Sequence, residues 1–181
     1  MGGLFITLGV LAAVAVFAAQ TSVYAWYAVI GAVAYGLIGL IDDLIIVLKK
    51  RSLGLKPYQK IAAQLIFAVL IALFAYNNPA IGSKLFVPIL NVEWDLGIWY
   101  IPFTVFVILA LTNSVNLTDG LDGLAGGVTL VNAATYCIIF FALVGTYVWA
   151  RDMLIFAGAL TGAILGFLRF NVYPARVFMG D

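Results

Sequence analysis

The stretch that decides the fold runs YAWYAVIGAVAYGLIGLIDDLIIVLKK over residues 24–50. A membrane-spanning helix needs about 20 mostly apolar residues, and no charged side chain interrupts this stretch before Asp42. Asp42 and Asp43 therefore come where such a helix reaches the membrane surface. Because residues 44–48 are again apolar, we expect the helix to continue past that surface to about Lys50.

The composition of the whole chain agrees with a membrane location. Of its 181 residues 65 % are hydrophobic and only 9 % are charged, whereas an ordinary soluble domain carries about 25 % charged residues. A soluble fold and a disordered chain are both excluded by these values. The net charge of +1 gives no reason to expect nucleic acid as a partner. A single cysteine and the absence of histidine exclude internal disulfides, Cys/His zinc sites and Ser-His-Asp triads.

The fold class predicted from this pattern is all-α, a polytopic membrane protein that forms one integral membrane domain over residues 1–181. Six apolar segments are long enough to be spanning helices, and they leave no room for a soluble domain. They cover residues 3–19, 24–42, 61–76, 98–115, 127–148 and 153–170.

The basic residues orient these spans in the bilayer. Seven of them fall in the loops 43–60, 116–126 and 171–181 or at their edges, and two fall on the other side. By the positive-inside rule the seven mark the cytoplasmic face. On the other side, residues 77–97 predict a turn or short hairpin that lies on the membrane. Gly158, Gly162 and Gly166 form a smooth helix face that favours close helix packing.

Five carboxylates are expected at the cytoplasmic face, where charged groups beside a membrane usually mark function. They are Asp42, Asp43, Asp119, Asp122 and Asp181. Asn116, Asp119 and Asp122 recur at a spacing of three, which would place them on one face of a helical turn. Such oxygen donors favour Mg²⁺, or Mn²⁺, held together with substrate phosphates. The chemistry indicates phosphoryl transfer at the membrane surface, and simple pairing of these acids with nearby lysines and arginines is the alternative.

Four motifs in this chain resemble a known family. They are MGGL at 1–4, IDDLIIVLKKRSLGLKPYQK at 41–60, NSVNLTDGLDGLAGG at 113–127 and NVYPARVFMGD at 171–181. Their order and their common membrane side are similar to those of the polyprenyl-phosphate N-acetylhexosamine-1-phosphate transferase superfamily. The lysine-rich loop and the form VFMGD resemble its phospho-N-acetylmuramoyl-pentapeptide-transferase branch.

The resemblance implies a Mg²⁺-dependent reaction in a bacterial cell membrane, with the active site on the cytoplasmic face. The implied substrates are UDP-MurNAc-pentapeptide and undecaprenyl phosphate, and the products are UMP and the first lipid-linked peptidoglycan precursor. Two alternatives stay open: a GlcNAc-1-phosphate transferase and, more distantly, a cation transporter. A transporter would place its carboxylates near the bilayer midplane rather than at one edge. A homodimer is one assembly that the sequence leaves open.

The resemblance also implies roles for single residues. Asp42 matches the aspartate that deprotonates or orients the lipid phosphate, Asp43 matches its motif neighbour, and Asp181 matches the Mg²⁺ ligand. Residues matching the substrate region, including the uracil site, are Asn116, Asp119, Gly120, Leu121, Asp122, Asn171 and Phe178. Lys50 could neutralise phosphate charge.

The chain departs from the family pattern in two positions and in extent. Ile46 stands where the family usually has a lysine, and the basic residue expected near Tyr58 is replaced by Lys56 and Lys60 nearby. The family has about ten spans and a histidine-rich cytoplasmic motif. We therefore expect this chain to be a six-span fragment that has no transferase activity alone.

Overall fold

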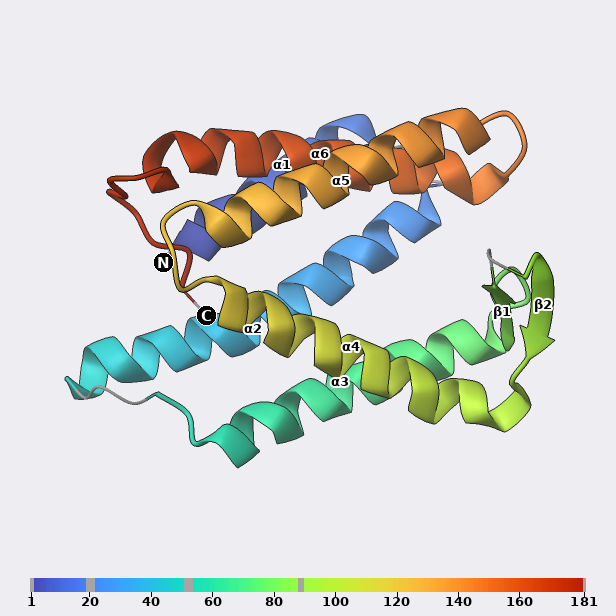
Figure 1. Ribbon diagram of the computed structural model, residues 1–181, viewed down its shortest axis with the longest axis horizontal. Coiled ribbons are helices and arrows are strands. Elements are labelled where there is room, and N and C mark those ends of the chain that lie inside the picture. Colours follow the sequence, from blue (N-terminus) through green and yellow to red (C-terminus); the bar gives the residue numbers. More distant parts are fainter. Residues whose placement is uncertain (1, 19–21, 51–53, 88–89, 181) are drawn as a thin grey trace. The chain divides into compact units, whose positions relative to one another are not determined.

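The computed structural model describes residues 2–18, 22–50, 54–87 and 90–180, and the described part is mostly helical (Figure 1). The helices are α1 (Gly2–Phe17), α2 (Val23–Lys49), α3 (Pro57–Asn77), η1 (Gly97–Trp99), α4 (Tyr100–Thr118), α5 (Leu124–Leu143) and α6 (Val148–Asn171). Two strands, β1 (Lys84–Val87) and β2 (Val92–Asp95), form an antiparallel hairpin.

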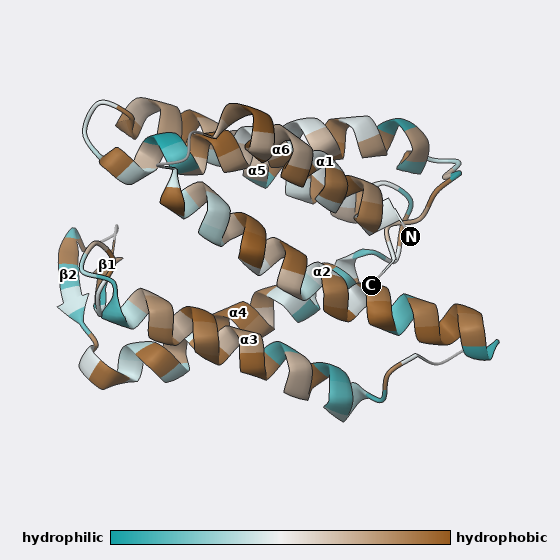
Figure 2. Cartoon of the chain, turned by 180° about the vertical axis from the view of Figure 1, so that it is seen from behind, coloured by the Kyte–Doolittle hydropathy of each residue, from teal (hydrophilic) through white to brown (hydrophobic). Residues whose placement is uncertain are grey.

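The helices confirm the predicted class, an all-α polytopic membrane protein. Five of the described helices are long and apolar enough to cross a membrane, and hydrophobic residues dominate them along their length (Figure 2). Helix α1 is shorter: its 16 residues span about 24 Å, less than the roughly 30 Å of a hydrocarbon core.

Helix α2 continues past its apolar stretch, as predicted, and ends with Lys50 as its C-cap in the left-handed conformation. Asp42 comes 19 residues after Val23, which corresponds to about 28 Å along the helix axis. This rise is close to the thickness of a hydrocarbon core, so a spanning α2 carries Asp42 and Asp43 to the membrane boundary.

The predicted end of the fifth span was wrong. Helix α5 ends at Leu143, and residues 144–147 make the turn, so Arg151 and Asp152 belong to α6 rather than to a loop. Hydropathy missed the turn because apolar side chains continue on both sides of it, and only Gly145 and Thr146 interrupt them.

The chain divides into two compact units, of which the first comprises Met1–Gly54 and Val115–Asp181. In this unit α6 packs against α1, α2 and α5, and α1 also packs against α2. Small side chains allow the close approach of α1 and α6, since a Cβ atom added to Gly9 would lie 3.3 Å from that of Ala163.

The glycine face of α6 has no packing partner within the described chain. A Cβ atom added at Gly158, Gly162 or Gly166 would meet no atom of the described chain within 4 Å. Gly158 and Gly162 instead line an apolar cavity of about 550 Å³ between α1 and α6. Ala163, one residue after Gly162, is among the α6 residues that contact α1.

A carboxylate fixes the start of α2 at the opposite end of this unit from Asp42. The Tyr24 N–H donates a 3.1 Å hydrogen bond to Oδ2 of Asp152, which is only 8 % exposed. Backbone N–H groups in the first turn of a helix have no partner within the helix, and a negative charge there also complements the helix dipole. Asp152 therefore joins α6 to the N-terminus of α2.

The second unit comprises Leu55–Ser114. Its helix α3 starts with Pro57 at the first helical position, and the Lys56 N–H donates to Oε1 of Gln59 at 3.1 Å. Buried Gln64 accepts a 2.9 Å hydrogen bond from Nδ2 of Asn113, which joins α3 to α4. The hairpin predicted between these two helices is present.

Candidate functional site

The N-terminal glycines and the VFMG segment meet at one end of the first unit. The Gly2 N–H donates to the Phe178 carbonyl and the Gly3 N–H donates to the Met179 carbonyl, both at 2.8 Å. These N–H groups belong to the first turn of α1, where a helix leaves its donors without intrahelical partners. The segment after α6 thus caps α1 and is held in place by it.

The two glycines differ in how much room they leave. A Cβ atom added at Gly2 would collide with the Phe167 ring and lie 2.8 Å from the Phe178 carbonyl oxygen. At Gly3 the nearest atom, the Met179 carbonyl oxygen, would be 3.4 Å away, which is an ordinary contact. Only Gly2 is therefore required by the close approach of the two backbones.

Asn171 fastens the loop before α5 to the segment after α6. Its side chain is 2 % exposed; Nδ2 donates to the Val177 carbonyl at 2.9 Å, and Oδ1 accepts from the Gly123 N–H at 3.1 Å. Asp122 adds a second link by accepting a 2.9 Å hydrogen bond from the Ala175 N–H. In the described structure Asn171 thus positions two motifs, and its predicted contact with substrate stays a prediction.

Asn116, Asp119 and Asp122 do not share one helix face, contrary to the expectation from their spacing. Helix α4 ends at Thr118, so Asn116 lies in its last turn while Asp119 and Asp122 lie in the following turn. This turn connects α4 to α5, whose N-cap Gly123 adopts a positive φ of 75°. The spacing alone could not distinguish a continuing helix from a turn.

The adjacent carboxylates of α2 are covered by different segments. Asp42 is 5 % exposed, and a Cβ atom added at Gly54 would collide with its carboxylate and lie 3.0 Å from its carbonyl oxygen. Asp43 instead faces the C-terminal motif: a Cβ atom added at Gly180 would collide with its carboxylate. The roughly 100° between successive helical residues gives the two acids these different neighbours.

Asp181, the predicted metal ligand, lies outside the described residues. Across residues 2–18, 22–50, 54–87 and 90–180 no three Asp, Glu or Cys side chains are close enough together to hold a metal ion. A five-carboxylate cluster is therefore not confirmed for the described part of the chain. The donor set remains suited to Mg²⁺, which usually takes one or two protein carboxylates and completes its shell with substrate phosphates and water.

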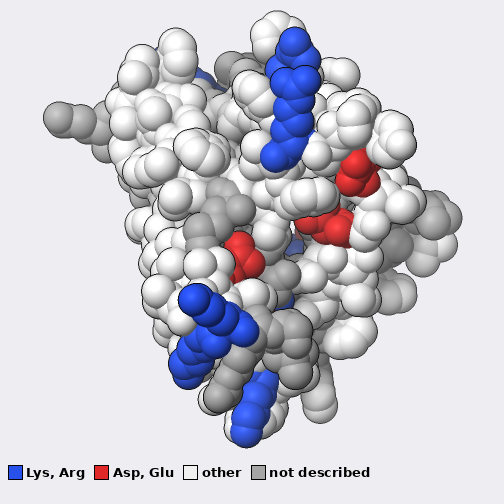
Figure 3. All heavy atoms as spheres, turned by 90° about the vertical axis from the view of Figure 1, so that its left-hand side faces the viewer, with Lys and Arg blue, Asp and Glu red and all other residues white. Residues whose placement is uncertain are grey.

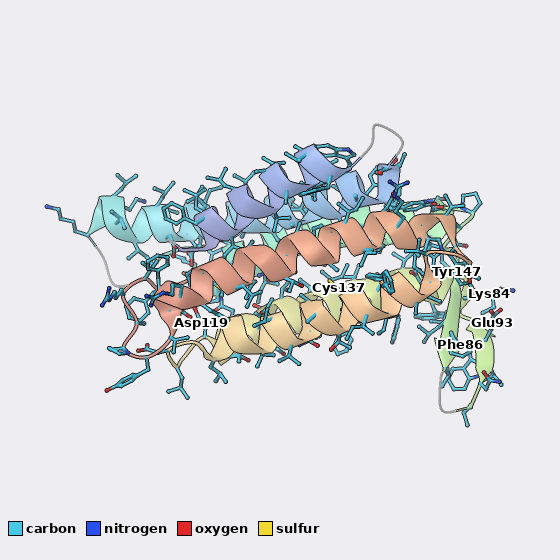
Figure 4. The ribbon with its side chains drawn as sticks, turned by 90° about the horizontal axis from the view of Figure 1, so that it is seen from above. Lys84, Phe86, Glu93, Asp119, Cys137 and Tyr147 are labelled. Atoms are coloured by element: carbon cyan, nitrogen blue, oxygen red, sulfur yellow. The ribbon has the colours of Figure 1, made fainter. Side chains whose placement is uncertain are left out.

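The other predicted site residues surround this end of the unit. Leu121 and Phe178 are 69 % and 64 % exposed, so both offer apolar surface there. Lys50 and Gly120 are exposed, and Asn116 and Asp119 are half-buried. Asp119 and Tyr147 mark opposite ends of the α5–α6 pair, with Cys137 between them (Figure 4).

Acidic and basic side chains both appear on the face of the molecule at the end that carries these residues (Figure 3). Four motif segments meet there through backbone hydrogen bonds, buried Asn171 and close glycine contacts. Such an arrangement can hold oxygen donors and an exposed aromatic ring in fixed positions at this end of the unit. Preorganised polar groups of this kind are the main means by which enzymes stabilise transferring phosphoryl groups.

Gly54 and Gly180 are residues whose part in this site the sequence did not reveal. Each leaves space for an aspartate carboxylate, and Gly180 also has a φ of 82°, which other residues rarely adopt. The available signal was the position of Gly180 directly before Asp181. A single sequence does not distinguish such a glycine from one that merely ends a turn.

Comparison with known proteins gives relatives along the whole chain. Phospho-N-acetylmuramoyl-pentapeptide-transferases from Clostridium novyi and Desulfitobacterium hafniense are 44 % and 42 % identical to it. The alignments include 100 % of this chain but 54 % and 56 % of those proteins, so the chain spans about half the length of the curated relatives it matches. The family profile described as glycosyl transferase family 4 matches residues 25–181, and the chain therefore belongs to this family.

Proposed function

We propose that this chain supplies part of the active site of a phospho-N-acetylmuramoyl-pentapeptide transferase. The observation that carries the proposal is the meeting of four motif segments at one end of the first unit. The names of relatives at 42–44 % identity support the same reaction. Its substrates are UDP-MurNAc-pentapeptide and undecaprenyl phosphate.

The proposed reaction exchanges one phosphorus–oxygen bond for another. An oxygen of the lipid phosphate attacks the phosphorus that bears the sugar, and the bond from that phosphorus to the UMP oxygen breaks. UMP leaves with the bonding electrons, and phospho-MurNAc-pentapeptide remains on the lipid. Because both reactants are anionic, the site has to orient them and offset their repulsion.

The chain's own residues suit this task in different ways. Asp42 is buried and lies next to the Gly54 backbone. It orients the lipid phosphate and accepts any proton that this phosphate carries. Asp43 lies beside Gly180 of the VFMG segment, and its carboxylate acts at the diphosphate of the UDP-sugar. The exposed Phe178 ring offers a surface on which the uracil stacks.

The carboxylates at this end fit Mg²⁺ by donor type, and Asp181 with Asp43 would hold it. When bound, the ion would neutralise charge on the diphosphate as phosphorus–oxygen bonds form and break. Asn171 and Asp122 keep the segment before Asp181 in register with the loop before α5.

We further propose that this end of the first unit faces the cytoplasm, and labelling of single cysteines tests it. In a cysteine-free background, Leu121→Cys and Tyr173→Cys occupy sites that are 69 % and 82 % exposed, and Val148→Cys, 93 % exposed, marks the opposite end of α6. An impermeant thiol reagent added to intact cells is expected to label only the Val148 variant. Labelling of Leu121→Cys or Tyr173→Cys, but not of Val148→Cys, would reverse the orientation.

The function itself is tested with the full-length gene product in detergent. With Mg²⁺, undecaprenyl phosphate and UDP-MurNAc-pentapeptide, we expect release of UMP and formation of the lipid-linked sugar. Omission of undecaprenyl phosphate should stop both. Release of UMP with UDP-GlcNAc in place of the muramoyl substrate would instead identify a GlcNAc-1-phosphate transferase.

A further inference from the structure

The β1–β2 hairpin has two chemically different faces. Its register pairs Lys84 with Asp95, Leu85 with Trp94, Phe86 with Glu93 and Val87 with Val92. Directly opposed residues of an antiparallel pair lie on the same face, and successive residues of a strand alternate between faces. One face therefore carries Lys84, Phe86, Glu93 and Asp95, and the other carries Leu85, Val87, Val92 and Trp94.

The first of these, the polar face, holds its charges in a connected set. Lys84 Nζ lies 3.4 Å from Glu93 Oε2, and the two residues lie next to each other on the hairpin (Figure 4). Asp95 accepts hydrogen bonds from Ser83 Oγ at 2.6 Å and from the Gly97 N–H at 2.9 Å. These donors, with a smaller effect from Lys84, lower the pKa of Asp95, so this carboxylate stays ionised in water.

The second, the apolar face, consists of four large side chains and is not fully covered by the described part of the chain. Trp94 is 53 % exposed and Val92 is 40 % exposed, while Leu85 and Val87 are half-buried. A single exposed hydrophobic residue needs no explanation, but here two exposed and two half-buried hydrophobic residues share one face, opposite a face that carries three charged residues and Phe86. The pattern is that of a surface between water and an apolar phase.

The position of the hairpin identifies that phase. It lies between α3, which ends at Asn77, and η1, which starts at Gly97, and both helical segments are candidate membrane spans. Its strands run across the axis of α3 rather than along it (Figure 1). Trp99, directly after the hairpin, is 73 % exposed at the start of the next span, where aromatic side chains anchor helices at the membrane interface.

We propose that the apolar face of the hairpin lies in the lipid interface, on the opposite side of the membrane from the start of α3. The polar face then points to water. A lipid surface is favoured over a protein partner because Ile98 and Trp99, which follow the hairpin at the start of the next candidate span, are also apolar and exposed. In this role the hairpin holds the α3–α4 connection at a fixed depth in the membrane interface. The role is independent of the proposed reaction.

Single-tryptophan variants of the full-length gene product test this proposal. One variant keeps Trp94, with every other tryptophan, including Trp26, Trp99 and Trp149, changed to Phe; its matched control also carries Trp94→Phe and Phe86→Trp. Positions 94 and 86 are 53 % and 55 % exposed, so they differ in face rather than in exposure. Both proteins are reconstituted in phosphatidylcholine vesicles whose acyl chains are brominated.

We expect brominated lipid to remove most of the Trp94 emission, whereas acrylamide in the water quenches the Phe86→Trp control instead. A further variant places the single tryptophan at position 92 of the same apolar face, by Val92→Trp with Trp94→Phe. It should be quenched like the Trp94 protein, and it tests the proposal if the first variant does not fold. Equal lipid quenching on both faces would overturn the proposal. Trp94 shielded from lipid and from acrylamide would indicate a protein partner and would overturn it as well.

Discussion

In the full-length enzyme, Asp42→Asn is expected to slow turnover by on the order of 10²–10³-fold relative to the unchanged protein. Asparagine preserves the shape of this 5 % exposed side chain and removes its charge, so the contact with Gly54 should persist. A loss of kcat would then report electrostatics rather than packing. The same substitution at Asp43 and at Asp181 is expected to have a comparable effect. UMP release in detergent, with kcat and KM determined separately, measures it.

Asp152→Asn is the matched control for Asp42→Asn. Asp152 is 8 % exposed and belongs to the same unit, but it caps α2 at the other end of the helix. An asparagine oxygen can still accept the Tyr24 N–H, so turnover should stay near that of the unchanged protein. Similar losses in both variants, accompanied by a lower temperature of unfolding, would show that buried charge in general, and not the site, is being measured.

The membrane class and the helices could be predicted because hydropathy over about 20 residues dominates this sequence. The continuation of α2 to Lys49 followed from apolar residues on both sides of the two aspartates. Hydropathy alone did not predict every helix end. It could not place the Gly145-Thr146 turn within an apolar stretch. The spacing of the α6 glycines separately predicted a packing face, for which the described chain supplies no partner within 4 Å.

That Asp42, Asp122 and Asn171 share one membrane side could be predicted from the sequence, but the contacts of these residues could not. The positive-inside rule predicts the membrane side of each loop and so groups Asp42, Asp122 and Asn171 on one face. The Asn171 amide hydrogen-bonds to backbone groups through both its oxygen and its nitrogen. These two bonds form because helix packing places Gly123 and Val177 beside it. Such pairings are long-range consequences of the fold, and residue type alone does not specify them.

Gly2→Ala is expected to lower kcat by on the order of 10²-fold, because misplacement of site groups by about 1 Å can have an effect of this size. A Cβ atom there would collide with the Phe167 ring and approach the Phe178 carbonyl oxygen to 2.8 Å. The VFMG segment must then move away from α1, and Gly180, which stands against Asp43, moves with it. The measurement is kcat and KM for the UDP-sugar in the full-length enzyme.

Gly3→Ala separates this effect from a general intolerance of side chains at the start of α1. Its Cβ atom would lie 3.4 Å from the Met179 carbonyl oxygen, so we expect turnover within a factor of about two of the unchanged enzyme. Gly2→Ala combined with Phe167→Ala removes the ring collision and leaves the carbonyl contact, so it should recover only part of kcat. Equal kcat values for Gly2→Ala and Gly3→Ala would contradict the idea that α1 positions the C-terminal motif. If Gly2→Ala lowers kcat while both variants unfold at the same temperature, the glycine acts through the position of the VFMG segment.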